Sequence, residues 1–411
     1  MVIIILLYSP EYIFCQNSDI QTINIKQNSD CSTALSVSTT SILGPTNAPE
    51  GYGKIHEIKD NPKTGSIYFE KENNSVWYKF KALYTANLVF DIVPLKESDD
   101  YDFLLYKSST ENFYSDLIQK RINPVRSNIA RSQGKNKGKT GLSWNATEEF
   151  VVAGPNNTYS KSVKVIKGEI YYLILDNVYP NGDGHYIIFD YLNDKGVSLN
   201  PKIIKGKVLD NNSGAILNAE ISFSKSATNE QEISVSTNPI TGEFAIVLNS
   251  DIDFFAEYTL NIKSKGYFFY QTSIIPYSVI NSKEVLTIKL EKLIKDEKYS
   301  ITKIYFYPNS PQFIPSSEPV LKELLNMMNE NPNMQIEIHG HIDGCQGDAF
   351  IIQKLSESRA YNIRKFLIDN GIHENRLNYK GFGCSKMVFS NPQNEEERQV
   401  NRRVEILILK I

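Results

Sequence analysis

One stretch near the end of the chain, residues 334–360, constrains the fold most, because a strand pattern is followed directly by a helix pattern. Apolar and polar residues alternate over Met334–Asp343, which is the period of a half-buried strand. Gly344 and Gly347 then interrupt the strand. Over residues 355–367 the apolar side chains recur at the spacing of one helix face. The sequence therefore predicts a strand, a polar loop and a helix in succession, as in an α/β layer.

Arg359 falls inside the apolar arc of that predicted helix, beside Leu355 and Ile363. A guanidinium keeps its charge when it is buried, so it needs a partner. Asp343, at the end of the preceding strand, is the expected partner or co-ligand. A carboxylate and a guanidinium that face each other can instead bind the ammonium and the carboxylate of a zwitterionic ligand. The residues alone leave both interpretations open.

Short motifs follow one another in a recognisable order through the last part of the chain. They are Ile304–Phe306 with Asn309, Asn331-Pro332, Gly340-His341-Ile342-Asp343, Leu355-Ser356-Glu357-Ser358-Arg359-Ala360, Gly371-Ile372, Arg376-Leu377, Gly381-Phe382-Gly383 and Asn401-Arg402-Arg403-Val404-Glu405. In this order they resemble the OmpA-like peptidoglycan-binding domain. The resemblance covers about residues 300–411.

The resemblance implies a ligand site. In that family the Asp of the Gly-His-x-Asp motif and the Arg of the Leu-Ser-x-x-Arg-Ala motif bind the diaminopimelate of the peptidoglycan stem peptide. The matching positions are Asp343 and Arg359. We expect Asn309 as a further peptidoglycan-binding residue, and Arg402 and Arg403 as supporting residues.

The N-terminal residues 1–15 resemble the end of a secretory signal peptide, with an apolar run before a Cys15-Gln16 break. No Lys or Arg precedes the apolar core, which is consistent with a truncated start. Cleavage is expected near Cys15 or Gln16, and the alternative is a buried N-terminal strand. Bulky Phe14 disfavours a lipoprotein signal. No other stretch reaches the length of an apolar membrane helix.

Removal of this leader would leave Cys31, Cys345 and Cys384. The loop around Cys345 and Gln346 is one residue longer than is usual in the OmpA-like family. An OmpA-like fold places the strand ends before Cys345 and Cys384 on one edge, which permits a disulfide in an oxidising compartment. The alternative is two small buried thiols. The cysteine spacings do not make a zinc site.

Strand-forming residues between turn clusters dominate the chain before residue 295, which predicts two all-β sandwich domains. Residues 16–198 carry a Trp strand, an Asp-Tyr-Asp-Phe-Leu-Leu-Tyr strand and a Gly-His-Tyr-Ile-Ile-Phe-Asp-Tyr strand. This pattern is similar to pre-peptidase C-terminal and related jelly-roll domains. Residues 201–292 are similar to carboxypeptidase regulatory-like domains, which have a transthyretin-like sandwich fold. Residues 293–299 are expected to be a charged linker.

Two features of the first sandwich suggest ligands, and for each a simpler interpretation is favoured. The basic Gly134–Thr140 segment has some likeness to a phosphate-binding loop but is one residue short, so we interpret it as a solvated loop. Asp99, Asp100 and Asp102 with Asp183 suggest a calcium site, and an exposed acidic turn is the alternative.

We therefore expect a multidomain protein with two β-sandwiches before an α/β OmpA-like domain. The expected function is a non-enzymatic, periplasmic and outer-membrane-associated tether to peptidoglycan, without cofactor or metal. An outer-membrane protein is a further expected partner, and the domain order resembles envelope proteins of Bacteroidota-type bacteria. The net charge of −3 gives no overall basicity for nucleic acid. The alternatives are a metal-dependent hydrolase that uses His339, His341 and Asp343, and an adhesion or secretion component with wall binding only as its anchor.

Overall fold

The computed structural model describes residues 21–58, 66–108, 112–132, 136–155, 157–226, 232–249, 252–281, 285–301 and 303–411. The chain divides into two compact units, Met1–Lys202 with Leu248–Ile252 and Ile203–Val247 with Asp253–Ile411. The expected leader, residues 1–15, and part of the basic 134–140 loop lie outside the described residues.

Within the described residues, no helix has both the length and the apolar character needed to cross a membrane.

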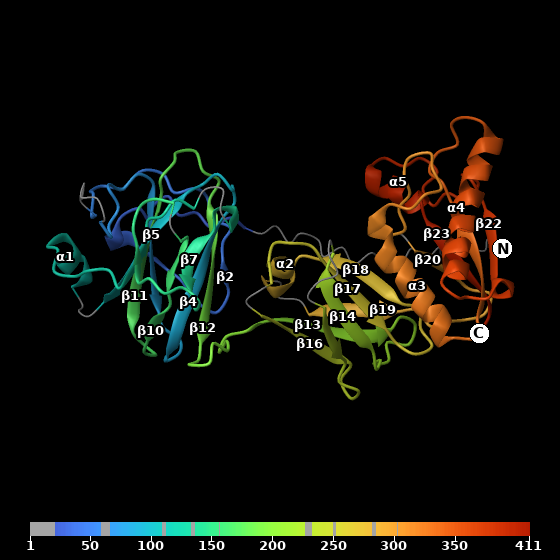
Figure 1. Ribbon diagram of the computed structural model, residues 1–411, viewed down its shortest axis with the longest axis horizontal. Coiled ribbons are helices and arrows are strands. Elements are labelled where there is room, and N and C mark those ends of the chain that lie inside the picture. The colour runs from blue at the N-terminus through green and yellow to red at the C-terminus, as the bar shows by residue number, and fades with distance from the viewer. Residues whose placement is uncertain are drawn as a thin grey trace, which may run out of the picture. The chain divides into compact units, whose positions relative to one another are not determined.

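The first unit is built from two β-sheets (Figure 1). One sheet has the strand order β1-β3-β11-β5-β6-β8, and the other has the order β2-β12-β4-β7-β9 with β10 beside β4. The strands are β1 (Leu35–Ser36), β2 (Ile42–Leu43), β3 (Ser75–Lys81), β4 (Ala86–Pro94), β5 (Tyr101–Ser108), β6 (Arg126–Asn128), β7 (Thr140–Ser143), β8 (Phe150–Val151), β9 (Tyr159–Lys161), β10 (Val163–Val165), β11 (Ile170–Asn177) and β12 (His185–Leu192). One short helix, α1 (Phe113–Ile118), follows β5. Aromatic residues of both sheets, including Phe90, Phe103 and Phe189, fill the core, as expected for β-rich sequence with many Tyr and Phe.

The second unit begins with two smaller sheets, of order β16-β13-β19 and β15-β14-β17-β18. The strands are β13 (Lys202–Asp210), β14 (Glu220–Lys225), β15 (Ile233–Ser236), β16 (Glu243–Leu248), β17 (Tyr258–Lys263), β18 (Tyr270–Ile274) and β19 (Leu286–Leu290), and α2 (Pro276–Asn281) lies between the last two. Burial alternates residue by residue along β13, β16 and β17, so each sheet has one buried face.

The last part of the second unit is a four-stranded sheet with helices, in the strand order β20-β23-β21-β22. Its strands are β20 (Lys298–Ile301), β21 (Gln335–Gly340), β22 (Leu377–Gly381) and β23 (Val404–Lys410), and its helices are α3 (Glu318–Glu330), α4 (Ala349–Asp369) and α5 (Glu395–Asn401). Strand β21 runs parallel to β22 and antiparallel to β23. The strand, loop and helix predicted from residues 334–360 correspond to β21, the following loop and the first half of α4.

Helix α4 lies close to the sheet because glycines face it. A Cβ atom on Gly340 would come within 2.2 Å of the carbonyl oxygen of Ser356, and one on Gly381 within 2.4 Å of the amide nitrogen of Glu357. Only glycine permits this approach of helix and strand backbones. This close contact fixes how far Arg359, about one turn further along the helix, lies from the sheet.

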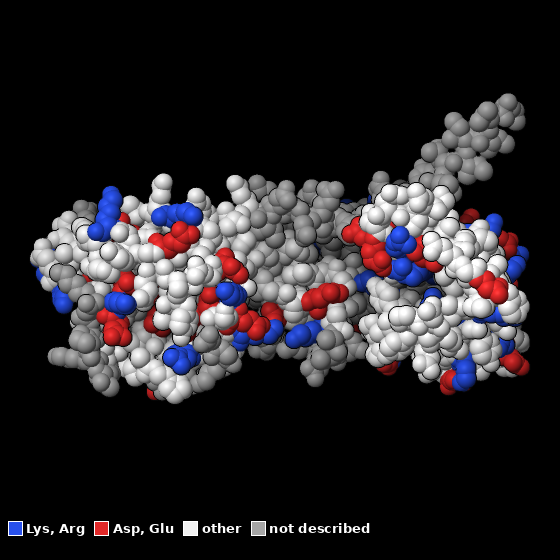
Figure 2. Space-filling view, turned by 90° about the horizontal axis from the view of Figure 1, so that it is seen from above, with Lys and Arg blue, Asp and Glu red and all other residues white. Residues whose placement is uncertain are grey.

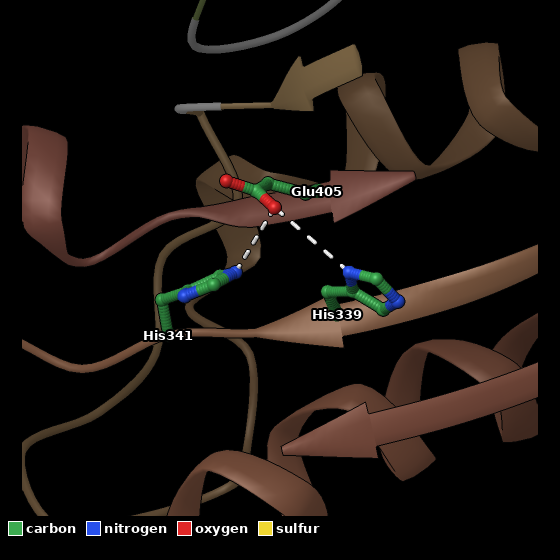
Figure 3. A group of neighbouring side chains, drawn as sticks. All are labelled: His339, His341 and Glu405. Carbon is green, nitrogen blue, oxygen red and sulfur yellow. Dashed lines mark ion pairs between the residues drawn. The ribbon is translucent and has the colours of Figure 1, made fainter. Parts of the chain in front are cut away.

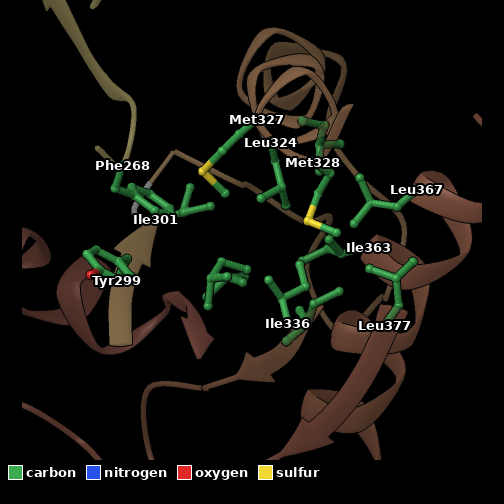
Figure 4. Packing of buried hydrophobic residues seen from close by; sticks show 14 of the residues in the cluster. Phe268, Tyr299, Ile301, Leu324, Met327, Met328, Ile336, Ile363, Leu367 and Leu377 are labelled. Carbon is green, nitrogen blue, oxygen red and sulfur yellow. The ribbon is translucent and has the colours of Figure 1, made fainter. Parts of the chain in front are cut away.

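Residues 293–299 differ from the free charged linker expected from their sequence. Leu293 and Tyr299 are buried in the core of the last sheet, whereas residues 294–298 are exposed. Tyr299 stacks on Phe268, with ring centroids 4.7 Å apart (Figure 4). The charged side chains of this segment therefore face solvent. Its apolar side chains pack in a single core together with residues that precede and follow the segment.

Charged side chains of both signs are interspersed over the face shown in Figure 2.

Candidate functional site

Asp343 lies three residues beyond β21, where the chain leaves the sheet. Its position is fixed by backbone hydrogen bonds on both sides: the His341 amide donates to the Arg403 carbonyl at 3.1 Å and the Ile342 amide to the Gly383 carbonyl at 2.9 Å. Asp343 thus stands at the edge where β21, β22 and β23 converge.

The Asp343 carboxylate has three partners from α5 and the residue after it. Asn401 Nδ2 donates to Oδ1 at 2.9 Å, and Arg398 Nη1 and Arg402 Nη1 lie 3.4 Å and 3.8 Å from Oδ2. The carboxylate is largely buried, with 7% of the side chain exposed, whereas the Arg398 and Arg402 side chains are 50% and 31% exposed. A buried negative charge is thereby flanked by two partly exposed positive charges.

Arg359 points from α4 into the turn before α3. Its Nε donates to the Ser310 carbonyl at 3.1 Å and its Nη2 to the Tyr307 carbonyl at 3.5 Å. These carbonyls flank Asn309, which adopts a positive φ of 52°. Burial, and then the nearby charge of Arg402, lower the pKa of Arg359 to about 10, so the guanidinium stays charged at neutral pH.

A direct pairing of Asp343 with Arg359, one of the two interpretations that the residues alone left open, is not found. Arg359 donates to carbonyls of the 307–310 turn, and Asp343 is paired with Asn401, Arg398 and Arg402 instead. The reason is that the turn brings two carbonyl acceptors within reach of the guanidinium, which local sequence spacing does not reveal. Arg402 links the two groups, because it is ion-paired with Asp343 and its charge acts on Arg359.

Asn401 is one of the residues that the sequence-based site missed, with Arg398 as another. It is fully buried, accepts hydrogen bonds from the Val388 and Phe389 amides, and donates to Asp343. Its side chain therefore ties the segment before α5 to the carboxylate. The signal was present, since Asn401 opens the Asn-Arg-Arg motif whose arginines were selected.

The two expected supporting arginines point to different places. Arg402 hydrogen-bonds Gln399, pairs with Glu395 and approaches Asp343. Arg403 instead binds Glu405 and the Lys386 carbonyl. Of the pair, Arg402 belongs to the surroundings of Asp343.

A disulfide joins Cys345 and Cys384, with Cα atoms 5.5 Å apart. It ties the loop after Asp343 to the loop after β22. Of the two interpretations left open by the sequence, the bonded pair is the one found.

His339, His341 and Glu405 form a buried cluster beside this site (Figure 3). The triad considered for a hydrolase contained Asp343 in place of Glu405. Because Asp343 is held by Asn401 and two arginines, that triad does not assemble. Glu405, on β23, was not selected from the sequence because its approach depends on strand pairing.

The acidic residues Asp99, Asp100, Asp102 and Asp183 do not form a metal-ligating group in the described part of the chain. Asp100 Oδ1 accepts hydrogen bonds from the Ser132 amide at 2.7 Å and hydroxyl at 2.9 Å, and Asp99 Oδ2 accepts one from the Asp183 amide at 3.3 Å. Protein donors therefore occupy carboxylate oxygens that calcium would require.

Comparison with known proteins finds a family model, curated relatives and solved structures that each match part of the chain. The family model described as the OmpA family matches residues 305–402. Photosystem I P700 chlorophyll a apoprotein A2 of Gloeobacter violaceus is 39% identical over 97 residues, which are 22% of this chain and 11% of that protein. Outer membrane porin F of Pseudomonas fluorescens is 37% identical over 91 residues, which are 22% of this chain and 27% of that protein. The chain thus spans about a tenth of the length of the first protein and about a quarter of the length of the second.

Among solved structures, an outer membrane protein from Borrelia burgdorferi is 28% identical. The match covers 28% of this chain and 87% of that chain, with a TM-score of 0.21.

Proposed function

Because residues 305–402 are an OmpA-family domain, we propose that this chain is a non-catalytic peptidoglycan-binding protein of the cell envelope. Asp343, Arg359 and Asn309 are its proposed peptidoglycan-binding residues. Arg402 supports them beside Asp343, and Arg403 supports them only from the neighbouring strand, where it binds Glu405. The ligand is the diaminopimelate of the stem peptide. The observation that carries this proposal is the buried Asp343 carboxylate held between Asn401 and two half-exposed arginines.

The chemistry of the ligand fits this arrangement. Diaminopimelate presents an ammonium and a carboxylate on one carbon. The Asp343 carboxylate is the acceptor for the ammonium. Arg398, with half of its side chain exposed, and the partly exposed Arg402 lie beside it and are the donors for the ligand carboxylate. Arg359 keeps the Asn309 turn in place through the carbonyls of Tyr307 and Ser310.

The upstream domains complete the proposal. Residues 16–198 form a jelly-roll-like sandwich in this proposal, and residues 201–292 form a carboxypeptidase regulatory-like sandwich. These two domains are the modules that the last domain tethers to the wall. The protein is then exported, periplasmic and associated with the outer membrane, with an outer-membrane protein as a further partner. Cell fractionation with antibodies to the chain tests this location, which a cytoplasmic pool would contradict.

The central test is co-sedimentation of the purified full chain with peptidoglycan sacculi. We expect the wild type to pellet, and free diaminopimelate to compete. Sacculi with lysine in place of diaminopimelate should pellet less protein. Asp369→Asn, which changes an exposed carboxylate on α4 paired with Lys365, is the matched control and should pellet like the wild type. A folded wild-type chain that stays in the supernatant would refute the proposal.

A further inference from the structure

Two histidine rings and a carboxylate converge on one point between β21 and β23. His339 and Glu405 are partners in the strand register, and His341 follows on the same side. Glu405 Oε2 lies 3.8 Å from His339 Nδ1 and 3.3 Å from His341 Nε2, and the donor atoms all lie within 4.8 Å of one another. Figure 3 shows both rings directed at this oxygen. Residues two apart on a strand are about 7 Å apart, and the neighbouring strand supplies the group that closes this gap.

The facing nitrogen atoms lack hydrogen-bond partners although they are buried. His339 and His341 are 2% and 4% exposed. Among the described residues, His339 Nδ1 and His341 Nε2 both face Glu405 Oε2, yet neither makes a hydrogen bond of good geometry. Buried polar atoms are usually satisfied, and an exception calls for a water or an ion.

The tautomer of His339 strengthens this point. Its Nε2 lies 2.6 Å from Glu337 Oε1, so the hydrogen bond assigns the ring proton to Nε2. In the neutral ring the lone pair of Nδ1 then faces the carboxylate of Glu405. Two electron-rich atoms directed at each other in a buried site favour a cation between them.

The surroundings of the cluster hold the ligand atoms in place. Arg403 binds Oε1 of Glu405 through Nε at 2.9 Å and Nη2 at 2.6 Å, which leaves Oε2 for the histidines. Glu337 orients His339 as a carboxylate orients a metal-binding histidine. The ring of Phe382 stacks on His341 at 5.2 Å and meets His339 edge-on at 4.7 Å.

We propose that His339, His341 and Glu405 bind one divalent cation of the zinc class. Two imidazole nitrogens and one carboxylate oxygen are the donor set that Zn²⁺ accepts, and its ligands at about 2.0–2.1 Å stand about 3.3 Å from one another. The His341 to Glu405 distance of 3.3 Å already matches this spacing. A bound ion would clamp β21 to β23 two residues before Asp343.

One side chain competes with the ion. Lys298 Nζ lies 3.6 Å from Glu405 Oε2, and its side chain is 49% exposed. The ammonium can therefore withdraw into solvent when a cation binds. This predicts that removal of the lysine charge strengthens metal binding.

The test is calorimetric titration of ZnCl₂ into the untagged full chain after treatment with EDTA and desalting. We expect one zinc per chain and a melting temperature that rises with zinc concentration. His341→Ala and Glu405→Gln should abolish this binding. Glu337→Gln should weaken it by about ten- to hundredfold, as for other groups that orient a ligand, and Lys298→Met should tighten it.

His373→Ala is the matched control, since His373 is exposed in the same domain and lies outside the cluster. It should bind zinc like the wild type. A wild-type chain that takes up no zinc overturns the proposal, whether or not the variants fold. One zinc per chain that persists in folded His341→Ala and Glu405→Gln, as judged by melting curves without zinc, overturns it as well.

Discussion

The guanidinium of Arg359 lies over the ring of Phe306, with 4.7 Å between Cζ and the ring centroid. The same group donates to the carbonyls of Ser310 and Tyr307. Helix α4 is thereby joined to the turn that carries Asn309 through one charged side chain. Arg359 is thus a positioning group for this turn as well as a proposed ligand contact.

Arg359→Ala should therefore reduce both stability and binding. A hydrogen bond from a charged group contributes about 1.5–3 kcal/mol, and the loss should lower the melting temperature of this domain by roughly 4–8 °C per kcal/mol. Differential scanning calorimetry and sacculus co-sedimentation measure the two effects. Lys354→Ala, on the exposed side of the same helix, should change neither. An unchanged melting transition with complete loss of binding would show that Arg359 only contacts ligand.

Asp343→Asn should weaken binding to sacculi but leave the stability of the domain nearly unchanged. The asparagine oxygen can still accept from Asn401. The pairs that are lost are long, at 3.4 Å and 3.8 Å, and involve partly exposed arginines, so they contribute little to stability. The charge that binds the ligand ammonium is lost, so affinity for sacculi should fall about ten- to hundredfold. A variant that binds sacculi normally would remove Asp343 from the site.

The disulfide between Cys345 and Cys384 should stabilise the last domain, because it closes a loop with a sequence separation of 39. Replacing both cysteines by serine should lower the free energy of unfolding by about 2–4 kcal/mol. Melting with and without a reductant should show the same difference in the wild type and none in the variant. Wild-type melting that does not respond to complete reduction would contradict this.

The core of the last sheet extends beyond the matched residues, so truncation should be sensitive to where it starts. A chain that begins at Ser300 loses Tyr299, which is 3% exposed, and the Phe268 ring stacked on it. Within the full chain, Phe268→Ala should cost about 3–5 kcal/mol, as for other buried aromatic truncations. Ile240→Ala, at a side chain that is 81% exposed, is the control and should melt like the wild type. Calorimetry would contradict the shared core if Phe268→Ala left the transition unchanged.

Sequence patterns predicted what depends on neighbours along the chain. The alternation of apolar and polar residues predicted β21, and the glycines that follow predicted where it ends. The helical spacing of apolar residues predicted α4, with Arg359 on its apolar face. The partners of Arg359 and Asp343 could not be predicted in this way. They come from a turn 49 residues before Arg359 and a helix 58 residues after Asp343. Glu405 likewise reaches the histidines only because β23 pairs with β21. The charged composition of residues 293–299 predicted a linker, but Leu293 and Tyr299 of this segment are buried in the core.

His185 should make the first unit sensitive to acid. The ring is fully buried, with Nε2 2.8 Å from the Tyr78 hydroxyl and Nδ1 3.2 Å from the Tyr101 hydroxyl. Burial lowers the pKa of His185 to about 3. In the unfolded chain a histidine has a pKa of about 6.5. Between these values the unfolded state binds a proton that the folded state rejects, so stability is fully present above about pH 6.5 and falls by up to roughly 1.4 kcal/mol per pH unit on acidification.

The measurement is urea unfolding followed by tryptophan fluorescence at pH 7 and pH 5, since both tryptophans, Trp77 and Trp144, lie in the first unit. Other groups of this unit titrate as well, so the informative quantity is the difference between the wild type and His185→Gln at each pH. The variant loses contacts of the imidazole and should be less stable at pH 7. Its disadvantage should shrink at pH 5, because it lacks the group that is penalised by acid. His56→Gln, at an exposed histidine of the same unit, is the matched control. If the deficit of His185→Gln does not change with pH, the buried ring is not what makes this unit sensitive to acid.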